Sequence, residues 1–185
     1  EHAREVVTVD MNVLCATYLR LRFASDKRVQ VIEGDFLGVD SVALTPGTFG
    51  AAVCVNVMEH VEDSAGLVER TASLLAPGGI FFVMVPAHHS LYGTIDAELQ
   101  HVRRYDRACL TQVLEPHFEV IESHYLNFPG AIAWWWNNRI AKSRTQSIPQ
   151  IWIFDRLFVP VLTRLERLWP PPFGQSVWAL ARKPE

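Results

Sequence analysis

Two carboxylates and one amide stand at the ends of successive apolar runs in the first third of the chain. They are Asp10, Asp35 and Asn56, and each closes or directly follows a run that reads as a buried strand. In an open parallel sheet, ligands bind beyond the carboxyl ends of the strands. We therefore expect these three side chains to face one ligand site.

The chemistry of these groups suits a nucleoside. The carboxylate of Asp10 can accept hydrogen bonds from both ribose hydroxyls, and Asp35 can accept one from an adenine amino group, with Phe36 against the ring. Each residue alone also has a structural interpretation, because an Asp after a strand is often a helix cap and Gly34-Asp35 can form a turn. Their order at the ends of successive strands favours a nucleoside cofactor.

A second group of reactive side chains follows Pro86. Its members can hold or move protons or bind anions, and they are His88, His89, Tyr92, His101, Arg103, Arg104 and Tyr105. Histidine titrates near neutrality, so His101 is a candidate general base. Either arginine can bind an anionic substrate, or can equally pair with Asp96 or Asp106. We expect catalytic groups from His101, Tyr105 and Arg104.

Alternating strand and helix patterns must position these groups. Continuous apolar strands favour an α/β fold with a mostly parallel sheet covered by helices on both faces. Strands are expected at 6–9, 28–32, 51–57, 80–85, 118–127 and 176–181. Helices are expected at 11–24, 62–76, 107–114, 129–142 and 150–168. We expect the first to bury Leu14, Tyr18 and Leu21, which share one helical face. The second should end at Pro77-Gly78-Gly79, and the last should be kinked at Pro160.

Four segments carry a resemblance to the class I S-adenosylmethionine-dependent methyltransferases, and it runs over the whole chain. They are Val-Val-Thr-Val-Asp (6–10), Val-Ile-Glu-Gly-Asp (31–35), Asn-Val-Met-Glu-His-Val-Glu-Asp (56–63) and Leu-Leu-Ala-Pro-Gly-Gly-Ile-Phe-Phe-Val-Met-Val-Pro (74–86). The last two segments in combination are specific to that family. Its members resemble this chain in having a Glu-His segment, then a helix, then Leu-x-Pro-Gly-Gly leading into a strand. The resemblance implies a Rossmann-like sheet with an antiparallel last strand, 176–181.

The resemblance also implies roles for individual residues. Asp10 would bind the ribose and Asp35 the adenine of S-adenosylmethionine, and the segment 56–60 would line its methionine side. The implied cofactor-binding residues are Asp10, Met11, Gly34, Asp35, Phe36, Asn56, Val57 and His60. We expect no metal, because Asn56 stands where some quinone and RNA methyltransferases have the first Glu of a Glu-x-x-Glu-His metal motif, although Glu59, His60 and His101 could still gather a divalent ion.

The chain departs from the family pattern at its start. The first strand of that family and its Gly-rich turn, which cradle the methionine part of the cofactor, should precede Glu1, and no Gly-x-Gly occurs elsewhere in the sequence. The expected fold therefore has its first strand missing. We expect the 185-residue chain to bind S-adenosylmethionine poorly, and micromolar binding in a calorimeter would refute this.

The tail of the chain differs in composition from the rest. Residues 1–133 hold nine Lys and Arg against 17 Asp and Glu, whereas residues 134–185 hold eight against three and contain all six Trp. We expect one domain over 1–185, with 128–172 as a helical, aromatic-rich lid insertion. The alternative is an interfacial surface at 134–169 that touches anionic lipid or gathers an apolar substrate.

These features bound the function. Length and composition suit a single globular domain, and the widely spaced cysteines favour the cytoplasm, with membrane association as the alternative. The acidic core argues against nucleic acid as a partner. We expect methyl transfer to a small-molecule acceptor, and the aromatic lid favours one that is lipid-linked or sugar-bearing. The alternatives are a non-catalytic binding module of the same fold and a NAD-binding oxidoreductase on a similar sheet. The oligomeric state is left open.

Overall fold

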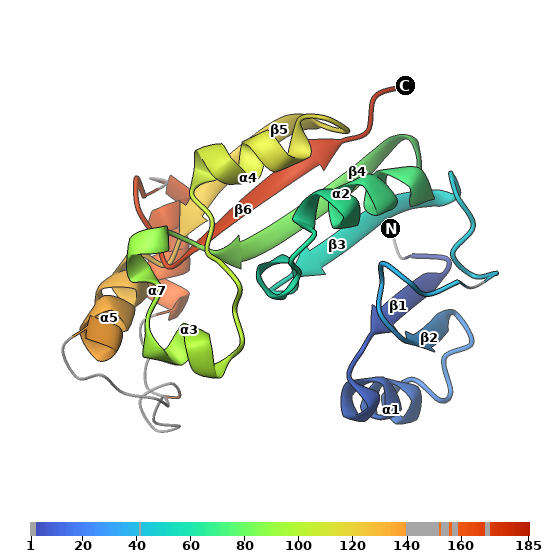
Figure 1. The fold of residues 1–185 in the computed structure, drawn as a ribbon, viewed down its shortest axis with the longest axis horizontal. Coiled ribbons are helices and arrows are strands. Elements are labelled where there is room, and N and C mark those ends of the chain that lie inside the picture. Colours follow the sequence, from blue (N-terminus) through green and yellow to red (C-terminus); the bar gives the residue numbers. More distant parts are fainter. Residues whose placement is uncertain (1–2, 41, 140–151, 153–155, 157–158, 169–170) are drawn as a thin grey trace.

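The computed structural model describes residues 3–40, 42–139, 152, 156, 159–168 and 171–185. Its strands form two sheets (Figure 1). The smaller sheet pairs β1 with β2 in parallel, and the larger has the order β3-β4-β6-β5. Within it β3 and β4 are parallel, and the last strand is antiparallel to both of its neighbours, as expected. The strands are β1 (Val6–Asp10), β2 (Val29–Glu33), β3 (Phe49–Val55), β4 (Leu75–Pro86), β5 (Glu119–Leu126) and β6 (Ser176–Arg182).

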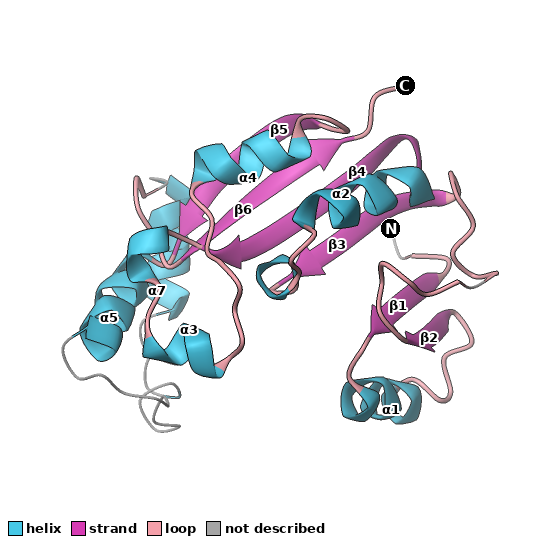
Figure 2. Cartoon of the chain, viewed as in Figure 1, coloured by secondary structure: helices cyan, strands magenta, loops and turns pink. Residues whose placement is uncertain are grey.

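Helices connect these strands, as Figure 2 shows. They are α1 (Val13–Arg22), η1 (Met58–His60), α2 (Ser64–Leu74), η2 (His89–Leu91), α3 (Thr94–Glu98), α4 (Arg107–Leu114), α5 (Phe128–Arg139) and α7 (Val159–Leu168). In the part of the chain that the structure describes, no helix is both long and apolar enough to cross a bilayer.

Side-chain caps start two of the helices. The Oδ1 atom of Asn12 accepts hydrogen bonds from the backbone N–H groups of Leu14 and Cys15, at 2.9 and 3.3 Å. The carboxylate of Asp63 accepts one from Gly66 at 2.8 Å. Each cap satisfies N–H groups that have no partner inside the helix. The caps fix where the two helices begin: α1 shortly after β1, and α2 shortly after η1.

The core lies between the larger sheet and helices α2 and α4, which pack on the same face. Val68 of α2 and Leu110 and Leu114 of α4 are fully buried against Val83 and its neighbours. Side chains on the opposite face of the sheet, such as Phe82, Met84 and Trp178, remain partly exposed. Burial of the first face holds the carboxyl ends of β3 and β4 rigidly in place.

Two predicted details are corrected by the structure, and a third lies largely outside the described residues. The predicted buried face of the first helix is wrong, because Leu14, Tyr18 and Leu21 are 81, 63 and 74% exposed and only Ala16 on this helix is buried. Helix α2 ends at Leu74 rather than at Pro77-Gly78-Gly79, which lie inside β4. Much of the predicted helix 150–168 falls outside the described residues.

Candidate active site

The predicted ribose and adenine carboxylates lie next to each other at the same end of the smaller sheet. Asp10 pairs with Glu33 across β1 and β2, and the N–H of Gly34 donates to the carbonyl of Asp10 at 3.0 Å. Asp35 follows directly. Asp10 accepts the backbone N–H of Asn12 at 2.8 Å, and Asp35 accepts that of Leu37 at 3.0 Å. Neither carboxylate joins an ion pair with another described residue.

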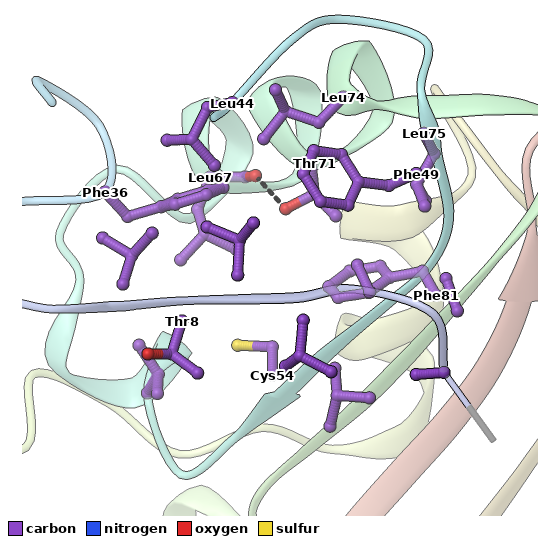
Figure 3. Close-up of a pocket in the computed structure, with 18 of the residues that line it drawn as sticks. Thr8, Phe36, Leu44, Phe49, Cys54, Leu67, Thr71, Leu74, Leu75 and Phe81 are labelled. Carbon is purple, nitrogen blue, oxygen red and sulfur yellow. Dashed lines mark hydrogen bonds between the residues drawn. The ribbon is translucent and has the colours of Figure 1, made fainter. Parts of the chain in front are cut away.

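A groove separates the two sheets (Figure 3). Residues of β1 and β3 line it together with α2, and it encloses about 520 Å³. Within the described residues, β1 pairs only with β2 and β3 only with β4, so the two strands face each other with unpaired edges. The lining is mainly apolar and includes Phe36 and Val57, whereas Asp10 and Asp35 lie outside it. Phe36 packs under the guanidinium of Arg70, 5.5 Å from its ring.

The chain turns sharply where β3 ends. The N–H of Asn56 donates to the carbonyl of Met84 at 2.9 Å, which is the last bond between β3 and β4. Asn56 then adopts a φ of 52°, in the left-handed region that Asn tolerates better than most residues. This turn leads into η1, so Glu59 and His60 come to lie beyond the sheet edge.

A second cavity, of about 320 Å³, opens at this edge. It is where β3 and β4 end and the antiparallel β6 begins. Polar side chains dominate its lining, and the set is Asn56, Glu59, His60, Pro86, Leu99, His101, Arg104, Trp134, Gln175 and Ser176. Four of the predicted site residues thus share one cavity: Asn56 and His60 from the expected cofactor group, and His101 and Arg104 from the expected catalytic group.

A buried carboxylate orients the catalytic candidates. Asp96 is fully buried and its Oδ1 atom lies 2.8 Å from Nδ1 of His101 and 2.7 Å from Nε of Arg104. Burial alone would raise the pKa of Asp96, but the hydrogen bonds from His101 and Arg104 outweigh it and hold this pKa below its ordinary value. Since the ionised carboxylate can only accept, Nδ1 of His101 donates to it.

Arg104 is held inside the protein rather than at the surface. Its guanidinium is 1% exposed, donates to the carbonyl of Ala87 at 2.9 Å, and lies 4.9 Å from the ring centre of Trp134. Burial lowers the pKa of Arg104, and pairing with Asp96 opposes this. The arginine thereby connects the wall of the cavity to helix α5.

Glu59 is a buried carboxyl group without a hydrogen-bond partner in the described part of the cavity. It is 1% exposed, and neither carboxylate oxygen has a hydrogen-bond partner among the described residues. Burial raises the pKa of Glu59 and lowers that of His60, whose ring lies 4.8 Å from that of His101 in an edge-on arrangement. One donor atom from each of these three residues falls within 4.8 Å of the others, a spacing at which they can hold a metal ion.

Backbone bonds tie the loop that carries His101 to the sheet. The N–H of Val102 donates to the carbonyl of Glu59 at 2.8 Å, and Tyr105 and Pro86 are joined by a bond of 3.0 Å. The hydroxyl of Tyr105 lies 2.9 Å from that of Ser64, in the core, and burial raises its pKa. Tyr105 does not line the cavity, so its position is that of a packing residue beside the site.

Sequence reasoning thus located part of the site and missed part of it. Of the remaining predicted residues, Met11 is 75% exposed beside Asp10, and the N–H of Gly34, directly before Asp35, donates to the backbone carbonyl of Asp10. Glu59, Asp96 and Trp134 were not among the predicted cofactor-binding or catalytic residues. Glu59 was expected only as a candidate metal ligand and Asp96 as an alternative partner of an arginine, and Arg104 makes that pair. The Glu-His pair gave a signal for Glu59, but Asp96 and Trp134 belong to segments without a motif.

The sequence is similar to those of known methyltransferases. The sequence matches the methyltransferase-domain family over residues 3–138. It is 41% identical over 58 residues to the ubiquinone biosynthesis O-methyltransferase of Xanthomonas campestris pv. campestris, covering 31% of this chain and 22% of that protein. A probable S-adenosylmethionine-dependent methyltransferase of Mycolicibacterium smegmatis is 28% identical over 131 residues, covering 70% of this chain and 49% of that protein.

A solved structure extends the likeness of the fold. The N-methyltransferase NodS from Bradyrhizobium japonicum WM9, in complex with S-adenosyl-L-homocysteine, superposes with a TM-score of 0.59 at 13% identity, covering 98% of this chain and 67% of NodS. The chain spans from about a fifth to about half of the length of the two curated relatives. The expected Rossmann-like fold is confirmed, and this chain belongs to the methyltransferase-domain family.

Proposed function

We propose that this chain serves methyl transfer from S-adenosylmethionine to a small-molecule acceptor in the cavity at the ends of β3 and β4. The observation that carries this proposal is that Asn56, His60, His101 and Arg104 line one cavity of about 320 Å³. That volume is in the range of small-molecule sites. A cavity that joins the expected cofactor side to a protein-derived proton acceptor is what methyl transfer to a hydroxyl or amine requires.

The residues present fit the nucleoside half of the cofactor. Asp10 and Asp35 are free of ion pairs with described residues and lie at adjacent strand ends, so both can accept hydrogen bonds from ribose and adenine. When bound, S-adenosylmethionine supplies the electrophilic methyl group. No Gly-x-Gly turn occurs in the 185 residues to hold its methionine half. We therefore propose weak binding, directed by Asp10, Asp35 and the Asn56–His60 segment.

The proton of the acceptor is proposed to leave through His101. With Nδ1 donating to Asp96 at 2.8 Å, the Nε2 atom of His101 keeps its lone pair and can accept a proton. In its ionised form, Glu59 can stabilise the positive charge that His101 acquires, because both side chains line the same cavity. Tyr105 bonds to Ser64 instead and is proposed to support the cavity wall.

The acceptor is proposed to be a hydroxyl compound with an apolar portion. The Xanthomonas relative is named as an O-methyltransferase of ubiquinone biosynthesis. Trp134 brings an aromatic wall from α5 into the cavity, next to the apolar side chains of Pro86 and Leu99 in the same lining. The position of Trp134 supports the proposal that 128–172 acts as a lid. It also supports a lipid-linked or sugar-bearing acceptor, because in both classes a polar reacting group adjoins a portion that can pack against the indole ring.

Binding of the nucleoside can be tested by NMR titration of the 185-residue chain with S-adenosylhomocysteine, adenosine and NAD⁺. We expect shifts at the amides of 10–12, 34–37 and 56–60 at about millimolar S-adenosylhomocysteine. Adenosine should move only the first two groups. Asp35→Ala should weaken the binding of both S-adenosylhomocysteine and adenosine. The control Asp40→Ala, which changes a nearby exposed carboxylate, should leave the binding of both unchanged. Shifts elsewhere, or a response to NAD⁺ alone, would refute the proposal.

A further inference from the structure

Helix α5 exposes an apolar stripe on one side. Phe128, Ile132, Trp135 and Trp136 follow the spacing i, i+4, i+7 and i+8, which places them on one helical face. Their exposed fractions are 42, 54, 44 and 57%. Single exposed apolar residues are ordinary, but four large ones on one face, two of them tryptophans, form a surface that water solvates poorly.

The neighbouring face of the same helix anchors it to the protein. Ala131 is fully buried and Trp134 is 8% exposed, and both pack against Leu91 and Ile95. The stripe is therefore not the outer part of a loosely placed helix. It is the second face of a helix whose first face is fixed on the cavity that holds Arg104.

Helix α7 is joined to the start of α5 and also carries exposed apolar side chains, and Figure 1 shows both helices at the same end of the molecule. The carboxylate of Glu166 accepts the backbone N–H groups of Asn127 and Phe128 at 2.9 and 3.0 Å, which joins α7 to the start of α5. On α7, Val161 and Leu168 are 54 and 85% exposed. Arg164 lies between them on the same face and is exposed as well.

The described part of this surface carries positive charge. Its cationic side chains are those of Arg156 and Arg164, both exposed, and the carboxylate of Glu166 is already bound to backbone N–H groups. Arg156 lies 5.8 Å from the ring centre of Trp152, and both side chains are exposed. Tryptophan and arginine together suit the interface of an anionic bilayer, where indoles lie at the headgroup level and guanidinium groups meet phosphates.

We propose that the exposed faces of α5 and α7, with Trp152 and Arg156, form a surface that binds the interface of an anionic lipid bilayer. The indoles and the apolar stripe enter the headgroup region, and the arginines pair with lipid phosphates. Because α5 also lines the cavity through Trp134, bilayer binding holds the cavity close to lipid. The surface acts whether or not the methyl-transfer proposal is right.

The test is flotation of the chain with vesicles of phosphatidylcholine containing about 30% phosphatidylglycerol, compared with pure phosphatidylcholine. We expect binding to the anionic vesicles and its loss at about 0.5 M salt. Trp135→Ser with Trp136→Ser should weaken binding by about tenfold or more. The matched control is Leu14→Ser with Leu21→Ser, which removes two exposed apolar side chains of α1 from the acidic part of the chain and should leave binding unchanged.

Several results would overturn the proposal. These are absence of binding to anionic vesicles, equal binding to both vesicle types, and unchanged binding of the tryptophan variant. A dimer in light scattering that the tryptophan variant abolishes, without vesicle binding, would assign the surface to a second copy instead. Circular dichroism of each variant checks its fold, and flotation needs neither cofactor nor acceptor, so its failure is distinct from failure of the proposed methyl transfer.

Discussion

The Oδ1 atom of Asp96 lies 2.8 Å from Nδ1 of His101, and the two side chains are 0 and 7% exposed. The same oxygen receives Nε of Arg104 at 2.7 Å. One buried carboxylate therefore fixes the ring orientation of His101 and neutralises a buried arginine. This makes Asp96 important for the stability of the protein as well as for the geometry of the cavity.

Replacing Asp96 by Asn tests this relationship. Asp96→Asn keeps the shape but leaves the guanidinium of Arg104 buried without its charge partner. We expect a loss of about 3–5 kcal/mol in the free energy of unfolding, measured by urea denaturation with circular dichroism. Asp40→Asn, on an exposed carboxylate, should change it by less than about 0.5 kcal/mol. A loss below about 1 kcal/mol for Asp96→Asn would mean that Arg104 is not held as described.

The buried carboxyl of Glu59 predicts a dependence of stability on pH. Burial raises its pKa, so between its unfolded pKa and its higher folded pKa the folded protein binds one more proton than the unfolded one. The contribution of Glu59 to the free energy of unfolding should therefore fall as the pH rises above about 4.3, by at most about 1.4 kcal/mol per pH unit. This fall should be absent from Glu59→Gln, in unfolding experiments that contain EDTA.

The control for this prediction removes a carboxylate from the surface. Glu115→Gln takes away one negative charge at the exposed end of α4, so any general effect of net charge appears in it too. If the parent protein instead gains stability relative to Glu59→Gln as the pH rises, then Glu59 has a charged partner that stabilises its ionised form.

The unpaired edges of β1 and β3 predict a pattern of amide exchange. Val6 donates to β2 and Asn56 to β4, and N–H groups alternate along a strand. The amides of Val7, Val9, Val53 and Val55 therefore point into the groove. In hydrogen exchange followed by NMR, we expect them to exchange about tenfold faster or more than those of Thr8 and Cys54, which lie between them. Equal protection of both sets would show that the groove edges are hydrogen-bonded in solution.

The order of strands and helices could be predicted from the sequence because it rests on local patterns. Continuous apolar runs such as Val6–Asp10, and the helix stop near Pro77-Gly78-Gly79, mark elements to within a few residues. The alignment of Asp10 with Asp35 followed from the same reasoning, since parallel strands end at one edge. Contacts that depend on tertiary packing gave no such signal.

Asp96 and Trp134 illustrate what a pattern cannot contain. Asp96 reaches His101 within a loop of short helical turns, where no periodicity relates the two residues. Trp134 was expected in a lid, but its place over Arg104 depends on which face of α5 turns inward. The apolar spacing of α1 predicted a buried face, yet that face has no described element packed on it, because spacing alone does not supply a partner.

That difference between apolar spacing and actual burial can be measured with two leucines. Leu110 of α4 is fully buried in the core, whereas Leu14 of α1 is 81% exposed, although both occupy positions on an apolar helical face. Leu110→Ala should lower the free energy of unfolding by about 2–5 kcal/mol through lost transfer energy and the cavity it leaves. Leu14→Ala should change it by less than about 0.5 kcal/mol, because its methyl groups are already in water. Urea denaturation of both variants decides, and a large loss for Leu14→Ala would mean that this face of α1 is covered in solution.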